Sequence, residues 1–372
     1  MKIQAAVLQE IGRARPFAAS RPIVVTELDL DEPGPGELLV RIEAAGVCHS
    51  DLSVVDGNRV RPVPMALGHE ASGIVEAIGP DVPSIAPGQR VVMTFLPRCG
   101  ECAACRSNGR VPCVAGSAAN NAGTLLGGDS RLHRGGTTVH HHLGVSGFAT
   151  HAVVDHRSVV PVDDDVPPDV AAVLGCAVLT GGGAVVNAGR PQPGQTVMVV
   201  GLGGVGMAAL ITAVGLGGLT VIGVDAVPDK LETARRLGAA EALTPDELAE
   251  HGVKADVVVE AAGNARAFEA AIAATAVGGT TVTVGLPRPD ARVSIAPLGL
   301  VAEGRTIVGS YLGSAVPERD IPRFVEMWRG GRLPVEELVS STIGLEDINA
   351  AMDQLADGRA IRQLIRFDRD GA

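Results

Sequence analysis

The segment Gly201-Leu-Gly-Gly-Val-Gly206 constrains the fold of this chain more than any other stretch. It follows an apolar run at 195–200, precedes an Ala- and Leu-rich segment, and is followed by a second apolar run at 219–224. The same alternation continues through two further apolar runs, 256–260 and 279–284. Repeated strand, helix, strand order with apolar strands is typical of an α/β fold, in which helices cover a doubly wound parallel sheet.

The glycines of this motif fit the binding of a dinucleotide. Gly201 permits a tight turn, Gly203 lets the backbone approach a pyrophosphate, and Gly206 allows a helix to pack closely on a strand. The helix that begins here would offer free N–H groups at its positive end. Asp225, which ends the next strand and is followed by Ala226, would bind an adenosine ribose and predicts NAD rather than NADP. A turn of this shape without a nucleotide is the alternative.

The first half of the chain has a different pattern. From Ile23 to about Val160, short apolar runs are separated by Pro and Gly, which is typical of an antiparallel, partly barrel-like domain. Residues 116–147 are polar and Gly-rich and are expected to form a loop. The run 361–366 is expected to form a strand that returns to this domain. A length of 372 residues fits two domains.

Charge and hydropathy exclude several classes of protein. The formal net charge of −11, without a basic run, argues against nucleic acid as a partner. The N-terminus lacks the apolar core of a signal peptide, and later apolar runs are interrupted by Gly, Pro or charge, which argues against a membrane protein. We therefore expect a cytoplasmic protein, in whose reducing compartment clustered cysteines bind metal more often than they form disulfides.

Four of the six cysteines lie within fifteen residues, at Cys99, Cys102, Cys105 and Cys113. This spacing lets one loop surround a tetrahedral zinc ion with Zn–S bonds of about 2.3 Å. A site of four thiolates has no open position and would be structural. An iron–sulfur cluster uses similar spacing, but the last gap of seven residues and the absence of Pro after Cys113 argue against it. Taken singly, the remaining Cys48 and Cys176 would be buried small hydrophobes, and His69 would be a core histidine.

Together these motifs resemble the zinc-dependent medium-chain alcohol dehydrogenases, and the resemblance covers essentially the whole chain. Its carriers are Gly46-Val-Cys48-His-Ser50-Asp51, Gly68-His69-Glu70, Pro87-Gly-Gln-Arg-Val91, the four-cysteine segment, Gly175-Cys176 with Thr180, Gly201–Gly206, Gly223-Val-Asp225 and Ile361-Arg362. The resemblance implies a GroES-like, mainly β catalytic domain at 1–177 and 312–372, with a structural zinc lobe at about 97–115. It also implies a Rossmann NAD-binding domain at 178–311 and an active site in the cleft between the two domains.

The resemblance implies that Cys48, His69 and Cys176 are the three protein ligands of a catalytic zinc. Water or the substrate oxygen would take the fourth position, which a Lewis-acid site requires. Asp51 matches the carboxylate that orients the ligand histidine, and Glu70 matches a carboxylate that can approach the metal. All six cysteines are thereby assigned to two zinc ions per subunit.

Two hydroxyls bear on the proton path. Ser50 matches the hydroxyl that hydrogen-bonds the substrate oxygen and begins the proton exit path. Ser53 stands where the best-studied family members have a histidine, so the outer part of this path is expected to differ.

The same resemblance implies the cofactor contacts. His49 and Arg362 match basic positions at the pyrophosphate, Thr180 and Val205 match residues that pack on the nicotinamide, and Lys230 matches a ribose contact. The expected cofactor-binding set is His49, Thr180, Gly201, Gly203, Gly204, Val205, Gly206, Asp225, Lys230 and Arg362.

The expected substrate pocket consists of Arg59, Phe95, His142, Leu143, Leu286 and Tyr311. Family members that act on simple alcohols are mostly apolar at the positions of Arg59 and His142, so a substrate with an apolar reacting end and a polar or acidic remote group is expected. An Arg59 side chain turned into water is the alternative. The run His140-His-His142 is assigned to a loop, with only His142 near the substrate, because adjacent residues of an extended segment cannot converge on one ion.

The resemblance implies reversible hydride transfer between an alcohol, primary or aromatic, and NAD, which gives the aldehyde or ketone. Dehydrogenation of an adduct between formaldehyde and a thiol is an alternative, and reduction of a C=C or C=N bond is a third. The segment 302–312 resembles the family's subunit-contact strand, so a homodimer or homotetramer is expected.

Overall fold

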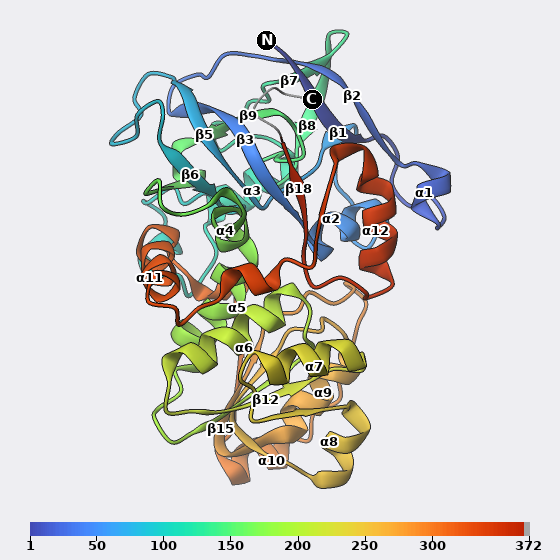
Figure 1. The fold of residues 1–372 in the computed structure, drawn as a ribbon, viewed down its shortest axis with the longest axis vertical. Coiled ribbons are helices and arrows are strands. Elements are labelled where there is room, and N and C mark those ends of the chain that lie inside the picture. Colours follow the sequence, from blue (N-terminus) through green and yellow to red (C-terminus); the bar gives the residue numbers. More distant parts are fainter. Residues whose placement is uncertain (368–372) are drawn as a thin grey trace. The chain divides into compact units, whose positions relative to one another are not determined.

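The computed structural model describes residues 1–367, which divide into two compact units (Figure 1). The first unit contains 1–176 and 339–367, and the second contains Ala177–Leu338. The first boundary lies one residue from the expected one, but the chain returns to the first unit at 339 rather than at 312. Residues 312–338 belong to the second unit because helix α11 (Pro317–Arg329) packs there, with the ring of Phe324 against the backbone of Gly182.

The first unit is built from a barrel and a sheet. The closed barrel has the order β1-β2-β7-β8-β4, and the sheet has the order β10-β6-β5-β3-β18-β17, with β9 also paired to β3. The barrel strands are β1 (Lys2–Leu8), β2 (Ile23–Leu30), β4 (Met65–Ala66), β7 (Leu132–Arg134) and β8 (Thr137–His141). The sheet strands are β3 (Glu37–Val47), β5 (Ala71–Ile78), β6 (Arg90–Met93), β9 (His151–Asp155), β10 (Val159–Val162), β17 (Ser341–Ile343) and β18 (Gln363–Arg366). The expected β-rich first domain is confirmed, and β18 pairs antiparallel with β3, as predicted for the returning strand.

Short helices complete this unit. They are α1 (Phe17–Ser20), α2 (His49–Val55), α3 (Val114–Ala122), α4 (Pro168–Val173) and α12 (Ile348–Ala356), with 3₁₀ turns at Cys105–Ser107, His156–Ser158 and Leu345–Asp347. Helix α12 lies beside α2 (Figure 1) and contributes Met352 to the buried cluster that also contains Val40 of β3 and Val75 of β5. The core is mainly aliphatic, as expected of a chain with one Trp, one Tyr and six Phe, although Phe17 and Phe148 belong to the same cluster.

The expectation of a loop at 116–147 was wrong. This stretch contains most of α3 and a hairpin formed by β7 and β8. The turn between the two strands is Gly135-Gly136, and both residues have a positive φ, which glycine adopts without steric cost. The His140-His-His142 run is accordingly not a loop, because β8 includes its first two residues.

The second unit is a parallel sheet of order β13-β12-β11-β14-β15-β16. Its strands are β11 (Thr196–Val200), β12 (Thr220–Val224), β13 (Glu241–Leu243), β14 (Ala255–Glu260), β15 (Thr275–Thr283) and β16 (Thr306–Gly309). Its helices are α5 (Leu179–Gly183), α6 (Gly204–Leu216), α7 (Pro228–Arg236), α8 (Pro245–His251), α9 (Ala265–Ala274), α10 (Pro297–Glu303) and α11, with π-helical Ala184–Gly189 and 3₁₀ turns at Tyr311–Ser314 and Val335–Leu338.

Helices cover both faces of this sheet. Adjacent residues of a strand point to opposite faces. On β12, Ile222 joins a buried cluster with Leu248 of α8 and Ala271 of α9, whereas Gly223 lies beneath Leu210 of α6. The predicted doubly wound sheet is therefore confirmed.

One helical segment has the length and composition of a membrane span. Pro168–Gly189 has a mean hydropathy of 1.8, so the expectation that every apolar run is too interrupted was wrong. However, 89% of its most apolar window is buried inside the structure, which is how the core helix of a globular protein satisfies the same test.

The glycine loop between β11 and α6 is shaped by close backbone packing. Gly201 has φ +93°, and a Cβ there would lie 2.6 Å from the backbone nitrogen of Ala262. A Cβ on Gly206 would lie 1.7 Å from the carbonyl oxygen of Gly201, whereas a Cβ on Gly203 would meet nothing within 4 Å. Gly201 and Gly206 are thus required by the fold, and Gly203 is not.

We predict that Gly206→Ala destabilises the second unit by about 1–3 kcal/mol, because the methyl group forces the helix away from the turn. The measurement is thermal unfolding followed by circular dichroism. Gly203→Ala is the matched control, and its midpoint should stay close to the native one because the added methyl group enters open space. Equal destabilisation by both substitutions would contradict this account of the loop.

Candidate active site

Three separate segments of the first unit bring Cys48, His69 and Cys176 together. Cys48 joins β3 to α2, His69 follows β4, and Cys176 lies in the π-helical turn Leu174–Val178. All three side chains are buried, and the Sγ of Cys176 lies 3.4 Å from the Nε2 of His69. The ligand atoms of these residues and of Glu70 all lie within 4.8 Å of one another. Two sulfurs, one nitrogen and one oxygen at this spacing form a donor set suited to zinc.

Glu70 is fully buried at this cluster without a hydrogen bond. Neither of its carboxylate oxygens has a hydrogen-bond partner. The absence of a side chain at Gly46 leaves space for this carboxylate, because a Cβ there would collide with it. Burial raises the pKa of Glu70 to about 7, against the opposing effect of Arg362. A buried carboxylate beside two thiols that makes no hydrogen bond fits a site that accepts a cation.

Arg362 lies inside the first unit beside this cluster. Its side chain is 3% exposed, its Nη1 donates to the carbonyl of Val47 at 3.0 Å, and its Nε lies 3.4 Å from the Oε1 of Glu70. A hydrogen bond with Cys176 lowers the pKa of the Cys48 thiol, and the charge of Arg362 lowers it further, although burial opposes both. In addition to the expected role at a pyrophosphate, Arg362 therefore stabilises negative charge on the ligands. The sequence motif gave no sign of this contact.

Asp51 holds the histidine of the cluster. Its Oδ1 lies 3.1 Å from the Nδ1 of His69 and accepts a hydrogen bond from the backbone N–H of Gly68, and its Oδ2 accepts one from the N–H of Cys48. Burial alone would raise the pKa of this carboxyl. The combined effect of His69 and His142 outweighs burial and lowers the pKa to about 2. A carboxylate at this place makes His69 carry its proton on Nδ1 and leaves Nε2 free to bind a metal.

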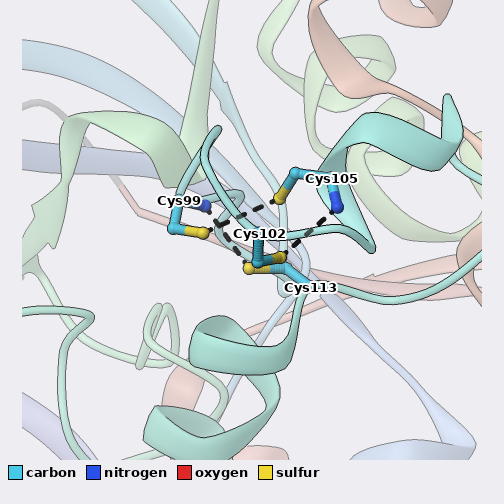
Figure 2. Close-up of side chains that lie close together, drawn as sticks. All are labelled: Cys99, Cys102, Cys105 and Cys113. Carbon is cyan, nitrogen blue, oxygen red and sulfur yellow. Dashed lines mark hydrogen bonds between the residues drawn. The ribbon is translucent and has the colours of Figure 1, made fainter.

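The four remaining cysteines converge on one point (Figure 2). The Sγ atoms of Cys99 and Cys105 are 3.9 Å apart, close to the separation of about 3.8 Å that tetrahedral geometry with Zn–S bonds of about 2.3 Å requires. Backbone N–H groups donate to the sulfurs of Cys102 and Cys113, and those of Val114 and Cys105 lower the pKa of Cys102 to about 6. All six cysteines of the chain are free thiols, so the structure holds no disulfide among them.

In the second unit, the dinucleotide motif has the expected local geometry. Asp225 accepts hydrogen bonds from the backbone N–H groups of Leu202 at 2.7 Å and Val227 at 2.9 Å, which joins the glycine loop to the end of β12. Thr180 is buried on α5. Val205, on α6, and Lys230, on α7, are half-buried.

Within the first unit, Ser50, His49 and Ser53 lie on α2, and Ser50 is half-buried while His49 is exposed. The Oγ of Ser53 donates to the carbonyl of His49 at 2.7 Å. The Ser53 hydroxyl is therefore hydrogen-bonded to the backbone of its own helix. Ser53 is the position where the proton path was expected to differ.

The expected pocket residues divide between the units. In the first unit, Phe95 packs edge-on against His69, Leu143 is buried with φ +52°, and Arg59 is half-buried. In the second unit, Leu286 is exposed and Tyr311 is half-buried.

His142, which was expected near the substrate, lies against Asp51 in the structure. Its side chain is buried, its Nδ1 lies 3.0 Å from the Oδ1 of Asp51, and burial lowers its pKa. Its imidazole therefore lies against Asp51, and Arg59 is the other expected pocket residue with a basic side chain.

We predict that the two cysteine clusters bind metal independently. Cys176→Ser should lose one equivalent of zinc per chain and Cys113→Ser the other, because each substitution removes a thiolate from a different ligand set. Metal content is measured by elemental analysis of protein purified without chelators. The matched control is Ser117→Ala, which leaves every cysteine in place. Loss of all zinc in either cysteine variant, or of none, would contradict two separate sites.

Comparison with known proteins agrees with this geometry. Residues 34–164 match the family of alcohol dehydrogenase GroES-like domains, and residues 204–329 match the zinc-binding dehydrogenase family. A Mycobacterium tuberculosis protein, provisionally named alcohol dehydrogenase D, is 38% identical over 375 residues, which cover 98% of this chain and 100% of its own. An NDMA-dependent alcohol dehydrogenase from Amycolatopsis methanolica is 35% identical over 380 residues and covers 100% of both chains.

A solved structure of an alcohol dehydrogenase has the same fold. Benzyl alcohol dehydrogenase from Acinetobacter calcoaceticus superimposes with a TM-score of 0.90 at 30% identity, and the match covers 99% of this chain and 100% of that one. Since the family matches, the parallel sheet and the two cysteine clusters agree, the chain belongs to the zinc-type medium-chain alcohol dehydrogenases.

Proposed function

We propose that this alcohol dehydrogenase transfers hydride reversibly between an alcohol and NAD, with one catalytic and one structural zinc per chain. The observation that carries the proposal is the buried centre of Cys48, His69 and Cys176, with the carboxylate of Glu70 beside it and free of hydrogen bonds. When bound, a zinc ion there supplies a Lewis acid that acidifies the alcohol's hydroxyl group.

The residues of the first unit then have defined tasks. Cys48, His69 and Cys176 hold the cation, and Asp51 keeps His69 in the tautomer that binds it. Ser50, at the start of α2, takes the proton of the alcohol at its Oγ and passes it outward. The guanidinium of Arg362 stabilises the negative charge of the thiolates.

NAD is supported by the glycine loop and by Asp225. The space beside Gly203 admits a pyrophosphate, and a carboxylate followed by Ala226 disfavours the 2′-phosphate of NADP. A primary or aromatic alcohol is supported by the relative named benzyl alcohol dehydrogenase, and Arg59 favours a polar remote group on it. Clustered free thiols that bind metal suit the reducing cytoplasm.

A second candidate concerns the electron acceptor. The Amycolatopsis methanolica relative, aligned over the full length of both chains, is named as NDMA-dependent. If this chain shares that property, alcohol oxidation would need NDMA as the added acceptor and added NAD would not support turnover.

The test is turnover of benzyl alcohol with one acceptor at a time. We expect NADH to accumulate when NAD is added, with the KM for NAD raised at least tenfold in Gly203→Ala, because the methyl group occupies the space of the pyrophosphate. Turnover with NDMA and none with added NAD would favour the second candidate. Absence of turnover with either acceptor, over a panel of alcohols and in zinc-replete protein, would contradict the proposed function.

We also propose that the enzyme is a homodimer formed through the second unit. Strand β16 is at the edge of the parallel sheet, so one side of its backbone is open to a partner strand. Val277, Leu298 and Val301, in β15 and α10, are 76%, 78% and 82% exposed, which is unusual for large apolar side chains. Because the same surface would meet itself about a two-fold axis, a second copy of this chain satisfies both features.

Replacement of Leu298 and Val301 together by Lys should convert the dimer to a monomer, because like charges would then face each other across the interface. The measurement is molar mass by light scattering after size-exclusion chromatography. Val60→Lys is the control, since Val60 is equally exposed but lies in the first unit. A native protein that already elutes as a monomer would contradict the proposal.

A further inference from the structure

One carboxylate oxygen of Asp51 is contacted by two histidines. The Oδ1 of Asp51 lies 3.1 Å from the Nδ1 of His69 and 3.0 Å from the Nδ1 of His142, and all three side chains are buried. The contact of His69 is a hydrogen bond, whereas the Nδ1 of His142 approaches Oδ1 as closely without the alignment of a hydrogen bond. His142 thus places a second imidazole against the carboxylate that orients His69.

The fold fixes His142 at this place through the backbone. Its N–H donates to the carbonyl of Ala66 and to the Oγ of Ser146, at the end of β8 where this strand runs parallel to β4. The following residues continue the pairing, since the N–H of Gly147 donates to the carbonyl of Gly68. The segment that carries His69 and the segment that carries His142 are therefore held side by side.

Two aromatic rings contact the imidazole of His69. The ring of His142 stands edge-on to it, with centroids 5.4 Å apart and planes at 87°, and the ring of Phe95 does the same at 5.5 Å and 84°. Because His69 is fully buried, close packing against these two rings restricts rotation about its χ2 angle. Because Asp51 also binds its Nδ1, the Nε2 of His69 is directed toward Cys176.

We propose that His142 is a positioning residue of the catalytic metal centre rather than a substrate contact. It acts through Asp51 by the close approach of its Nδ1 and on His69 directly by its ring, and together these contacts position the ligand nitrogen. This inference rests on the proposed metal centre but not on the identity of the alcohol or the acceptor. Partners of this kind change metal affinity by about 10–100-fold when they are removed.

The experiment measures zinc release to an excess of chromogenic chelator from protein purified with its native metal content. The phase that disappears in Cys176→Ser belongs to the centre of Cys48, His69 and Cys176, and its rate is compared between variants. His142→Phe keeps an aromatic ring but loses the nitrogen that lies against Asp51, and should accelerate this phase about tenfold or more. His142→Asn places its amide N–H near the position of Nδ1 and should restore a slow release, whereas His142→Gln cannot reach that position and should not.

The adjacent His141 provides the matched control. It is equally buried, but it contacts the N–H of Arg131 and the Oγ of Ser146 rather than Asp51 or His69. His141→Phe should leave the metal-release rate near the native value. Equal acceleration by His141→Phe, or equal rates in His142→Asn and His142→Gln, would overturn the proposal.

Metal release also separates this inference from the proposed function. Because it needs no turnover, fast release from His142→Phe supports the positioning role even if benzyl alcohol is not a substrate. If His142→Phe does not fold, the comparison of the Asn and Gln variants decides the question.

Discussion

The burial of ionisable side chains around Cys48, His69 and Cys176 is the constraint on which the rest of the first unit depends. Two thiols, one imidazole and the carboxylates of Asp51 and Glu70 are excluded from water. Each unpaired buried charge costs several kcal/mol, so the cluster is stable only if its negative charge is balanced. Arg362 and the N–H donors around Asp51 balance part of it, and the divalent cation that we propose at the two thiolates would balance the rest.

The two cysteine clusters differ in how the fold brings their ligands together. The four cysteines at 99–113 come from one short loop, which has few apolar side chains to bury. A metal ion bound by these cysteines would stabilise the folded loop in place of a hydrophobic core. The ligands of the other centre come from distant segments, namely the end of β3, the end of β4 and the π-helical turn at Leu174–Val178. Sheet and helix packing therefore hold the ligand atoms of this centre close together.

What the sequence predicted depends on how far apart the relevant residues are. The glycine loop and the four-cysteine segment are contiguous, so their spacing alone contains the geometry that the structure shows. The hairpin of β7 and β8 was missed because polar composition outweighed the Gly135-Gly136 turn signal. Contacts between distant segments, such as Glu70 with Arg362 and Asp51 with His142, depend on strand pairing that no local pattern encodes. The return to the first unit at 339 likewise depends on packing of α11.

The central claim is that cations occupy both cysteine clusters. An anomalous difference map, from a crystal of native protein measured at the zinc absorption edge, tests it most directly. The account predicts two peaks per chain, one enclosed by Cys48, His69 and Cys176 and one enclosed by the four cysteines at 99–113. A crystal with intact, active protein and no peak between Cys48, His69 and Cys176 would contradict it.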